Sequence, residues 1–316
     1  MKVSLIATIL NEEKNILVFL ESLLIQTEMP YDVIIVDGGS EDNTVNLIRK
    51  FVKEHTLPFI FELSTKKGNR SRGRNEAISR ATGDVILITD VGCILDKNWV
   101  KKIQGPLLNE RVDVVAGYYA AKAETVFQKC LIPYVLVMPD RVNPKVFLPA
   151  SRSMAISKKV WQDLEGFDER FSHNEDYVFA RKLVTTGKKI VFVKEAIVYW
   201  VPRTTLSQAY TMFYRFALGD IEASIIRPKV IVLAIRYVLA LLLLLLGLIT
   251  REWFLVGLTI LLLLLYMIWS ISKNYRYVNQ LQALIYLPLL QFTADFAVLQ
   301  GSLNGLISRV LTIRHK

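Results

Sequence analysis

Cysteine is scarce in this sequence. Its 316 residues include two cysteines, Cys93 and Cys130, and these show neither a pairing pattern nor the spacing of a metal-binding motif. The scarcity excludes a disulfide framework and indicates a reduced compartment. Internal repeats and low-complexity stretches are also missing, so the sequence does not predict a repeat architecture.

No basic face interleaved with aromatic residues is found, although the formal net charge is +10. Such a face is typical of nucleic-acid binding, so no nucleic-acid partner is predicted. Part of the charge comes from Arg203, Arg215, Arg227 and Lys229, which precede the first long hydrophobic run. Basic residues beside a membrane span favour the cytoplasmic side, where we expect the N-terminal domain to lie.

Hydrophobic residues are abundant at 52%, and they gather in the C-terminal part of the chain. Two runs, about 230–250 and 253–271, each supply the ~20 apolar residues that cross a bilayer. A third apolar segment, about 281–308, contains Pro288 and Asp295, and it either spans, re-enters or lies along the interface. The sequence therefore predicts a multi-pass membrane protein with a transmembrane region over 229–316.

Residues 204–228 contain "TTLSQAYTMFYRFALGDIEASII", which predicts an amphipathic helix rich in aromatic residues. One interpretation is a linker helix packed on the domain before it. The other is a helix in the membrane interface, which would bring a ligand crevice near lipid. We favour the interfacial helix because a predicted span follows at once.

Strands alternate with helices over residues 1–203. The runs "KVSLIAT", "YDVIIVD", "PFIFEL" and "GDVILITD" predict strands, and helical periodicity separates them. This order predicts an α/β domain with a mainly parallel, doubly wound sheet, whose ligands bind beyond the carboxyl ends of the strands. Further along we expect a long loop over 133–153, two strands "KKIVFV" and "AIVYW", and helix N-caps at Asn11 and Asn174.

Polar residues follow two of the predicted strands. Asp37 precedes Gly-Gly-Ser, so its carboxylate can accept hydrogen bonds from a base or ribose, and Gly39 lets a ligand approach the backbone. Glu12, after the first strand, can also reach a ribose. A plain strand-to-helix turn explains the first pattern equally well, and a favourable charge at a helix start explains the second.

The stretch "KKGNRSRGRN" carries five basic residues, among them Arg70 and Arg74. Arginine binds diphosphate in bidentate fashion, so the stretch predicts a contact with a diphosphate. A solvated charged loop is the alternative.

Two acidic patterns point to chemistry. Asp90 ends the strand "GDVILITD", and two positions later Gly92 stands where a metal-binding enzyme would carry a second carboxylate. Glu175 and Asp176 open the helix "NEDYVFARKL", where they either stabilise the helix start or supply a general base. The spacing by itself does not choose between these interpretations.

Five segments in order resemble the inverting nucleotide-sugar glycosyltransferases of family 2, which have the GT-A fold. They are "ATILNEEKNI", "IIVDGGSEDNT", "GRNEAISRATGDVILITD", "EGFDERF" and "NEDYVFARKL", and the resemblance covers residues 1 to about 220.

The resemblance implies roles for individual residues. Thr8, Glu12, Asp37 and Arg74 match positions that hold the nucleotide, and Asp90 matches the first aspartate of the Asp-x-Asp motif. Asp176 matches the catalytic base, with Glu175 as its usual neighbour. Loosely aligned equivalents of residues that close over the diphosphate or acceptor are Trp200, Arg203 and Arg215.

The missing second carboxylate at Gly92 leaves Asp90 as the one candidate ligand for Mg²⁺ or Mn²⁺. The neighbouring thiol of Cys93 is a poor ligand for these ions, which prefer oxygen. We therefore expect a weakly bound or optional divalent cation. Either Asp90 and the donor phosphates hold it with water, or the arginines at 70–74 take over part of its charge.

The predicted activity is transfer of a sugar from a nucleoside diphosphate donor to a hydroxyl of a lipid-linked saccharide. Transfer to a polyprenyl phosphate is the alternative within the same class. In a different class, the chain would be a pseudoenzyme that binds nucleotide sugar, for which Gly92 argues. A processive polysaccharide synthase is disfavoured because the chain lacks a Gln-x-x-Arg-Trp-like motif and has few spans.

Overall fold

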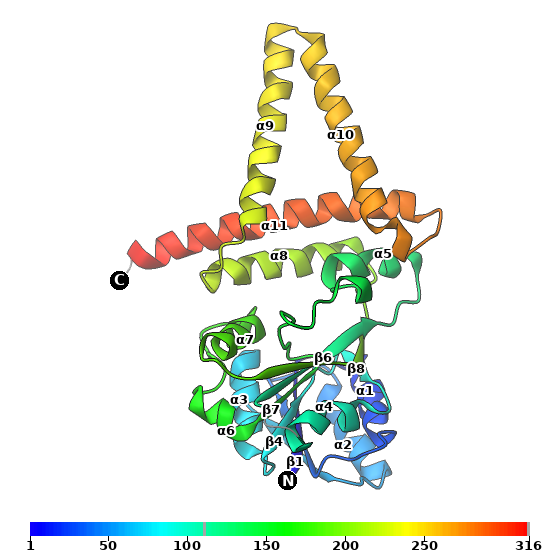
Figure 1. The fold of residues 1–316 in the computed structure, drawn as a ribbon, viewed down its shortest axis with the longest axis vertical. Coiled ribbons are helices and arrows are strands. Elements are labelled where there is room, and N and C mark those ends of the chain that lie inside the picture. Colours follow the sequence, from blue (N-terminus) through cyan, green and yellow to red (C-terminus); the bar gives the residue numbers. More distant parts are fainter. Residues whose placement is uncertain (110–111, 315–316) are drawn as a thin grey trace. The chain divides into compact units, whose positions relative to one another are not determined.

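The computed structural model describes residues 1–109 and 112–314 (Figure 1). They form two compact units. Unit 1 consists of Met1–Lys122 and Val137–Val201, and unit 2 consists of Ala123–Leu136 and the chain from Pro202 onward. The predicted transmembrane region extends to residue 316, and residues 315–316 lie outside the described part.

Unit 1 contains one eight-stranded sheet. Its strands are β1 (Val3–Ile9), β2 (Asp32–Asp37), β3 (Ile60–Thr65), β4 (Val85–Ile88), β5 (Cys93–Leu95), β6 (Val114–Ala121), β7 (Met154–Ser157) and β8 (Ile190–Trp200). Its α-helices are α1 (Ile16–Leu24), α2 (Thr44–Glu54), α3 (Arg70–Arg80), α4 (Trp99–Asn109), α6 (Lys158–Asp163) and α7 (Glu175–Thr185).

The strand order is β3-β2-β1-β4-β7-β6-β8-β5. The first four strands are mutually parallel, and β6 is parallel to β8, whereas β7 and β5 run antiparallel to their neighbours. Strands β1, β2 and β4 are buried almost throughout, because helices cover parallel sheets on both faces. The prediction of a mainly parallel α/β domain is confirmed.

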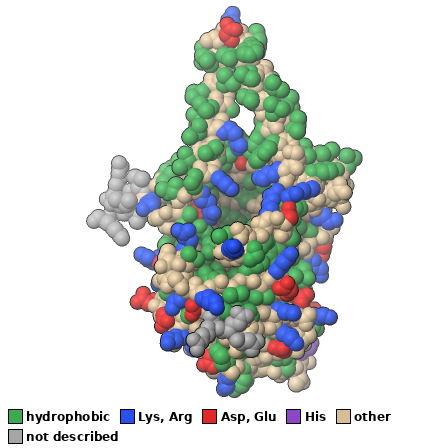
Figure 2. All heavy atoms as spheres, viewed as in Figure 1, with side chains coloured by type: hydrophobic (Ala, Val, Ile, Leu, Met, Phe, Trp, Pro, Cys, Tyr) green, Lys and Arg blue, Asp and Glu red, His purple; other side chains and the backbone are tan. Residues whose placement is uncertain are grey.

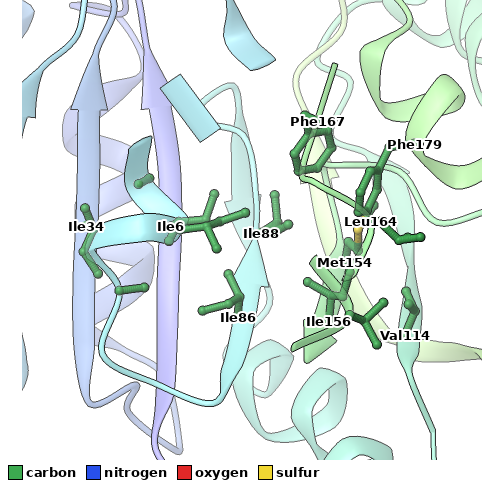
Figure 3. Packing of buried hydrophobic residues seen from close by; sticks show 14 of the residues in the cluster. Ile6, Ile34, Ile86, Ile88, Val114, Met154, Ile156, Leu164, Phe167 and Phe179 are labelled. Carbon is green, nitrogen blue, oxygen red and sulfur yellow. The ribbon is translucent and has the colours of Figure 1, made fainter. Parts of the chain in front are cut away.

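One part of the core joins the sheet to the helices that carry candidate residues. Ile6, Ile34 and Ile88 from the sheet pack in one cluster with Phe167 and Phe179, and with Ala77 and Ile78 of α3 (Figure 3). The rings of Phe167 and Phe179 stack with their centroids 4.3 Å apart. This packing fixes α3 and α7 against the sheet.

Some sequence predictions for unit 1 were wrong. Helix α1 begins at Ile16, and Asn11 adopts a positive φ of 56° instead of capping it. Hydrogen bonds between the loops after β1 and β2 hold Asn11 in this conformation. Asn11 N donates to Ser40 Oγ, and Asn11 Oδ1 accepts from Glu41 N. Asn174 is the N-cap residue of α7, as predicted, but its side chain makes no capping hydrogen bond.

Three further differences concern strands and loops. Residues 190–200 form one strand, β8, whose pairing with β6 shifts register between Gly117 and Tyr118. Strand β5 was not predicted, since three residues are too short for a periodic pattern. The predicted loop 133–153 begins later than expected, because α5 (Val126–Val135) includes its first residues.

Unit 2 is helical. Besides α5 it contains α8 (Leu206–Glu222), α9 (Pro228–Thr250), α10 (Trp253–Asn274) and α11 (Ala283–Arg314). Helices α9 and α10 form a hairpin (Figure 1), and the side chains seen on it in Figure 2 are mostly hydrophobic, with charged side chains at its tip. In the described part of the chain, three helical segments are long and apolar enough to cross a membrane: 228–250, 253–277 and 283–309.

The third of these segments differs from the other two. Its most apolar window is 39% buried within the structure, against 6% for each of the others. Helix α11 runs alongside α8 and crosses the base of the hairpin (Figure 1). Gly301 and Gly305 permit the close approach, since an added Cβ would lie 2.4 Å from Tyr214 O and 2.8 Å from Ile221 Cβ respectively.

A buried polar cluster joins the three long helices of unit 2. The carboxylate of Asp295 on α11 accepts hydrogen bonds from Tyr266 (2.6 Å), Tyr237 (2.8 Å) and Gln291 (2.9 Å). Arg236 of α9 lies 3.3 Å from the same carboxylate, and its guanidinium stacks over the Tyr266 ring at 4.0 Å. A buried charge is tolerated only when it is paired and hydrogen-bonded in this way.

Replacing Asp295 with asparagine should destabilise unit 2 by about 2 kcal/mol, because hydrogen bonds to a charged acceptor are lost. Tyr266→Phe, which removes one donor, should cost about 1 kcal/mol. Thermal unfolding of the detergent-solubilised protein measures both. Equal stability of Asp295→Asn and the wild type would contradict a structural role for this cluster.

Candidate active site

The carboxyl ends of β1, β2 and β4 lie at one edge of the sheet. The register pairs Ile9 with Asp37 on β2, and Ile6 with Ile88 on β4. Thr8, Asp37 and Asp90 therefore share that edge, as the parallel order of the strands predicted.

The loops after β1 and β2 are joined by hydrogen bonds. Glu12 N donates to Thr44 Oγ1 at 2.8 Å, and the Glu12 carboxylate accepts from Asn15 Nδ2 at 2.7 Å. The carboxylate of Asp37 accepts from the backbone N–H groups of Gly39 (3.2 Å) and Ser40 (3.0 Å). Gly39 has φ +104°, which a side chain would strain. These hydrogen bonds to Asp37 fix the conformation of the turn after β2. The carboxylate oxygens of Asp37 still have lone pairs that can accept hydrogen bonds from a ligand.

Arg74 on α3 links two of the candidate carboxylates. Its Nη1 donates to Glu175 Oε1 at 2.5 Å, and its Nη2 donates to Asp90 Oδ1 at 3.0 Å. The side chains of Arg74 and Glu175 are only 2% and 4% exposed, whereas that of Asp90 is 33% exposed. Gly73 lets α3 approach the sheet, since a Cβ there would lie 2.9 Å from Thr8 Cγ2.

These ion pairs control protonation. Burial alone would raise the pKa of Asp90, but the positive charges of Arg74, Arg70 and Arg152 more than offset it and hold that pKa below its ordinary value. Burial works against the charge of Arg74, yet Asp90 and Glu175 raise the pKa of its guanidinium. Asp90 and Arg74 are therefore both charged at neutral pH.

Asp176 has the opposite behaviour. It lies in the first turn of α7, and its Oδ1 accepts from Tyr177 N at 2.8 Å. Burial first, and the adjacent negative charge of Glu175 second, raise the pKa of Asp176 above its ordinary value, although Arg74 and Arg152 oppose the shift. The positive end of the helix dipole favours the ionised carboxylate, but desolvation outweighs that effect. A raised carboxyl pKa brings a base closer to neutral pH, which suits proton transfer.

Sequence reasoning missed Arg152. It lies just before β7, where Thr89 Oγ1 donates to the Arg152 carbonyl oxygen at 2.9 Å. Its guanidinium lies over the rings of Tyr119 and Trp200, at 5.6 Å and 5.7 Å from the centroids. It interacts electrostatically with Asp90 and Asp176. No periodicity or motif marks this position, which the sequence analysis placed inside a loop.

The remaining candidates are distributed over both units. Arg70 is exposed at the first position of α3, close enough to Asp90 to lower its pKa. Trp200 is 6% exposed at the end of β8, paired with Cys93 of β5. Arg203 and Arg215 belong to unit 2, where both are exposed.

The donor set around Asp90 does not match a protein-held divalent cation. Gly92 offers no side chain, and Asp90 Oδ1 is bonded to Arg74. Burial, and next the charge of Asp90, raise the pKa of the Cys93 thiol to about 12, so it stays protonated. Within residues 1–109 and 112–309, no group of three or more His, Cys, Asp or Glu side chains is placed to hold a metal ion.

Two models of known protein families match the sequence. The family model described as "Glycosyl transferase family 2" matches residues 4–147, and that described as "Glycosyl transferase family group 2" matches residues 85–298. Together they include β1, α3, β4, α7 and most of the apolar helices.

Curated relatives agree. The poly(ribitol-phosphate) beta-N-acetylglucosaminyltransferase TarS of Staphylococcus aureus is 24% identical over 220 residues, which are 66% of this chain and 38% of TarS. The undecaprenyl-phosphate 4-deoxy-4-formamido-L-arabinose transferase of Yersinia enterocolitica is 25% identical over 151 residues, 46% of this chain and 45% of that protein. The chain spans only 38% of the length of the first curated relatives that it matches.

Solved structures share the fold. The mannosyltransferase PcManGT from Pyrobaculum calidifontis, in complex with GDP-Man and Mn²⁺, aligns with a TM-score of 0.54 at 17% identity, over 70% of this chain and 62% of that chain. S. aureus TarS 1–349 in complex with UDP-GlcNAc aligns with a TM-score of 0.51 at 21% identity, over 70% and 67%. A divalent cation is therefore compatible with the fold. By its family models, the chain belongs to glycosyltransferase family 2.

Proposed function

We propose that the protein moves a sugar from a nucleoside diphosphate donor to a hydroxyl of a lipid-linked saccharide, with inversion at the anomeric carbon. The observation that carries the proposal is Asp176, a half-buried carboxylate in the first turn of α7, which adjoins Glu175 of the Arg74 ion pair and whose pKa is raised. Asp37 and Asp90 lie at the edge of the sheet where ligands of such folds bind.

In this proposal, Thr8, Glu12, Asp37 and Gly39 line the site of the nucleoside. Arg70, which is exposed beside Asp90, contacts the diphosphate. Arg74 is a positioning residue, because its two bonded nitrogens point at Asp90 and Glu175.

The step is a single displacement. The acceptor hydroxyl gives its proton to Asp176, and its oxygen forms a bond to the anomeric carbon. The bond from that carbon to the donor phosphate breaks on the opposite face, and the nucleoside diphosphate leaves with the bonding electron pair. Holding both substrates in line supplies much of the rate acceleration.

A lipid-linked acceptor is supported by the apolar helices of unit 2 and by the name of the Yersinia relative. A phosphate acceptor is already ionised and hardly needs a base, so Asp176 favours a hydroxyl. The basic residues before α9 favour the cytoplasmic side for the catalytic unit.

Trp200, Arg203 and Arg215 are proposed to contact the acceptor or the diphosphate. A weakly held Mg²⁺ or Mn²⁺ at Asp90 is proposed as optional.

The test uses the full chain in detergent with a panel of nucleotide sugars and a lipid extract. Release of nucleoside diphosphate and a mass-shifted lipid are measured together, with and without chelator. We expect release to require lipid. A shift on a saccharide hydroxyl supports the proposal, and a shift on a polyprenyl phosphate replaces it by the alternative. Donor binding without product under every condition would support a pseudoenzyme.

A further inference from the structure

The carboxylates gathered near Asp90 outnumber the buried arginine that pairs with them. Asp90, Glu175 and Asp176 gather around a single buried arginine, Arg74, which is already bonded to two of them. A donor diphosphate adds further negative charge. The residue at the second Asp-x-Asp position is Gly92, and the surrounding donor set does not match a protein-held cation. Arg70, exposed at the start of α3, supplies part of the positive charge that a diphosphate needs, and a second cation inside the site must supply the rest.

Arg152 is built to supply it. Its backbone is fixed by the hydrogen bond from Thr89 and by the bridge between Ala150 and Ser153. Ser153 is held in turn by Trp99, whose Nε1 donates to Ser153 Oγ at 2.8 Å. The guanidinium thus projects from a rigid loop, and pre-organisation of this kind lowers the entropic cost of binding.

The surroundings of the guanidinium leave its donors available. Two aromatic rings, Tyr119 and Trp200, contact it, and neither can accept a conventional hydrogen bond through its face. Among residues 1–108 and 112–309, the Arg152 side chain makes no hydrogen bond and no ion pair within 4.0 Å. An arginine presents five N–H donors in a planar fork that matches phosphate oxygens.

We propose that Arg152 binds the diphosphate of the nucleotide-sugar donor and supplies the positive charge for which Gly92 leaves no metal ligand. The proposal rests on the proposed function, since it assigns the leaving-group site of that reaction. When the bond from the anomeric carbon to the phosphate oxygen breaks, the electron pair stays on that oxygen. Arg152 remains protonated and stabilises the new charge, while the acceptor proton goes to Asp176.

The experiment measures UDP and GDP binding to the detergent-solubilised full chain by isothermal titration calorimetry, once with excess EDTA and once with MnCl₂. The wild type should bind one of them with similar affinity in both conditions. Arg152→Gln should weaken binding about ten- to a hundredfold, the usual range for a lost charged hydrogen bond. Arg152→Lys, which keeps the charge but loses the fork, should show a smaller loss. Arg49→Gln, an exposed arginine on α2, is the matched control and should change nothing.

A double variant tests whether a metal ion can replace the positive charge of Arg152. A Cβ at Gly92 would have no atom within 4 Å, so the position has room for aspartate. Arg152→Gln combined with Gly92→Asp should regain affinity in MnCl₂ and not in EDTA. Thermal unfolding confirms that each variant is folded.

The outcomes are separable. Unchanged binding by folded Arg152→Gln, or a wild type that binds nucleotide only with Mn²⁺, would overturn the role of Arg152 and leave the transferase proposal in place. Failure of the wild type to bind either nucleotide in any condition would overturn the proposed function itself.

Discussion

Asp176→Asn is expected to lower kcat by about a thousandfold, within the range that general-base catalysis contributes. Asparagine keeps the shape of the side chain but cannot take the proton of the acceptor hydroxyl. Binding of nucleoside diphosphate should persist, because the proposed donor contacts lie on other residues. Product formation from saturating donor and acceptor, measured beside calorimetric binding, separates the two effects.

The pH dependence adds a second observable to this prediction. The base must be ionised, and the pKa of Asp176 is raised in the folded protein. Activity should therefore fall as the pH is lowered through that raised pKa, at a midpoint above the ordinary aspartate value of about 4.

Asp176→Asn should lower activity but raise the stability of the protein at neutral pH. A carboxyl group whose pKa is higher in the folded than in the unfolded state binds its proton more tightly when folded, so its ionisation at neutral pH costs stability. Asp176→Asn should therefore unfold at a higher temperature than the wild type at pH 7. This gain should shrink as the pH falls through the raised folded pKa, and it should be gone below the ordinary aspartate pKa of about 4.

Asp84→Asn is the matched control for both measurements, because Asp84 is an exposed carboxylate before β4, at the opposite end of that strand. It should leave activity and stability unchanged. Full activity of folded Asp176→Asn would remove Asp176 from the mechanism.

Arg74→Met is expected to have the largest effect on stability, about 3–5 kcal/mol, because it leaves a buried carboxylate without its cation. Glu175 accounts for most of this cost, since its side chain is 4% exposed, whereas Asp90 is one-third exposed and is partly screened by water. Denaturant unfolding of the detergent-solubilised protein, followed by circular dichroism, measures the loss.

A double variant tests the cause. Arg74→Met combined with Glu175→Gln removes both charges of the buried pair, and it should recover part of the stability that Arg74→Met loses. Arg80→Met, which removes an exposed arginine of the same helix, should change stability far less, because exposed ion pairs contribute little. A double variant no more stable than Arg74→Met would show that packing, and not the unpaired carboxylate, explains the loss.

The sequence by itself determined the class of fold and the family. Buried strands of four to eight apolar residues, alternating with helical periodicity, require a parallel sheet covered on both faces, and long apolar runs require burial or a membrane. These are properties of local pattern, so β1, β2, β4 and the α9–α10 hairpin were predictable. The place of Asp37 and Asp90 at one edge followed from strand direction alone.

Only the tertiary structure decided how the charges are paired. Arg74 meets Glu175 across 101 positions of sequence, and Arg152 reaches Tyr119 and Trp200 from a loop without any pattern. The raised pKa of Asp176 likewise results first from desolvation in the folded chain, which the local sequence does not show. Desolvation and ion pairing depend on which segments pack together, and local periodicity carries no information about that packing.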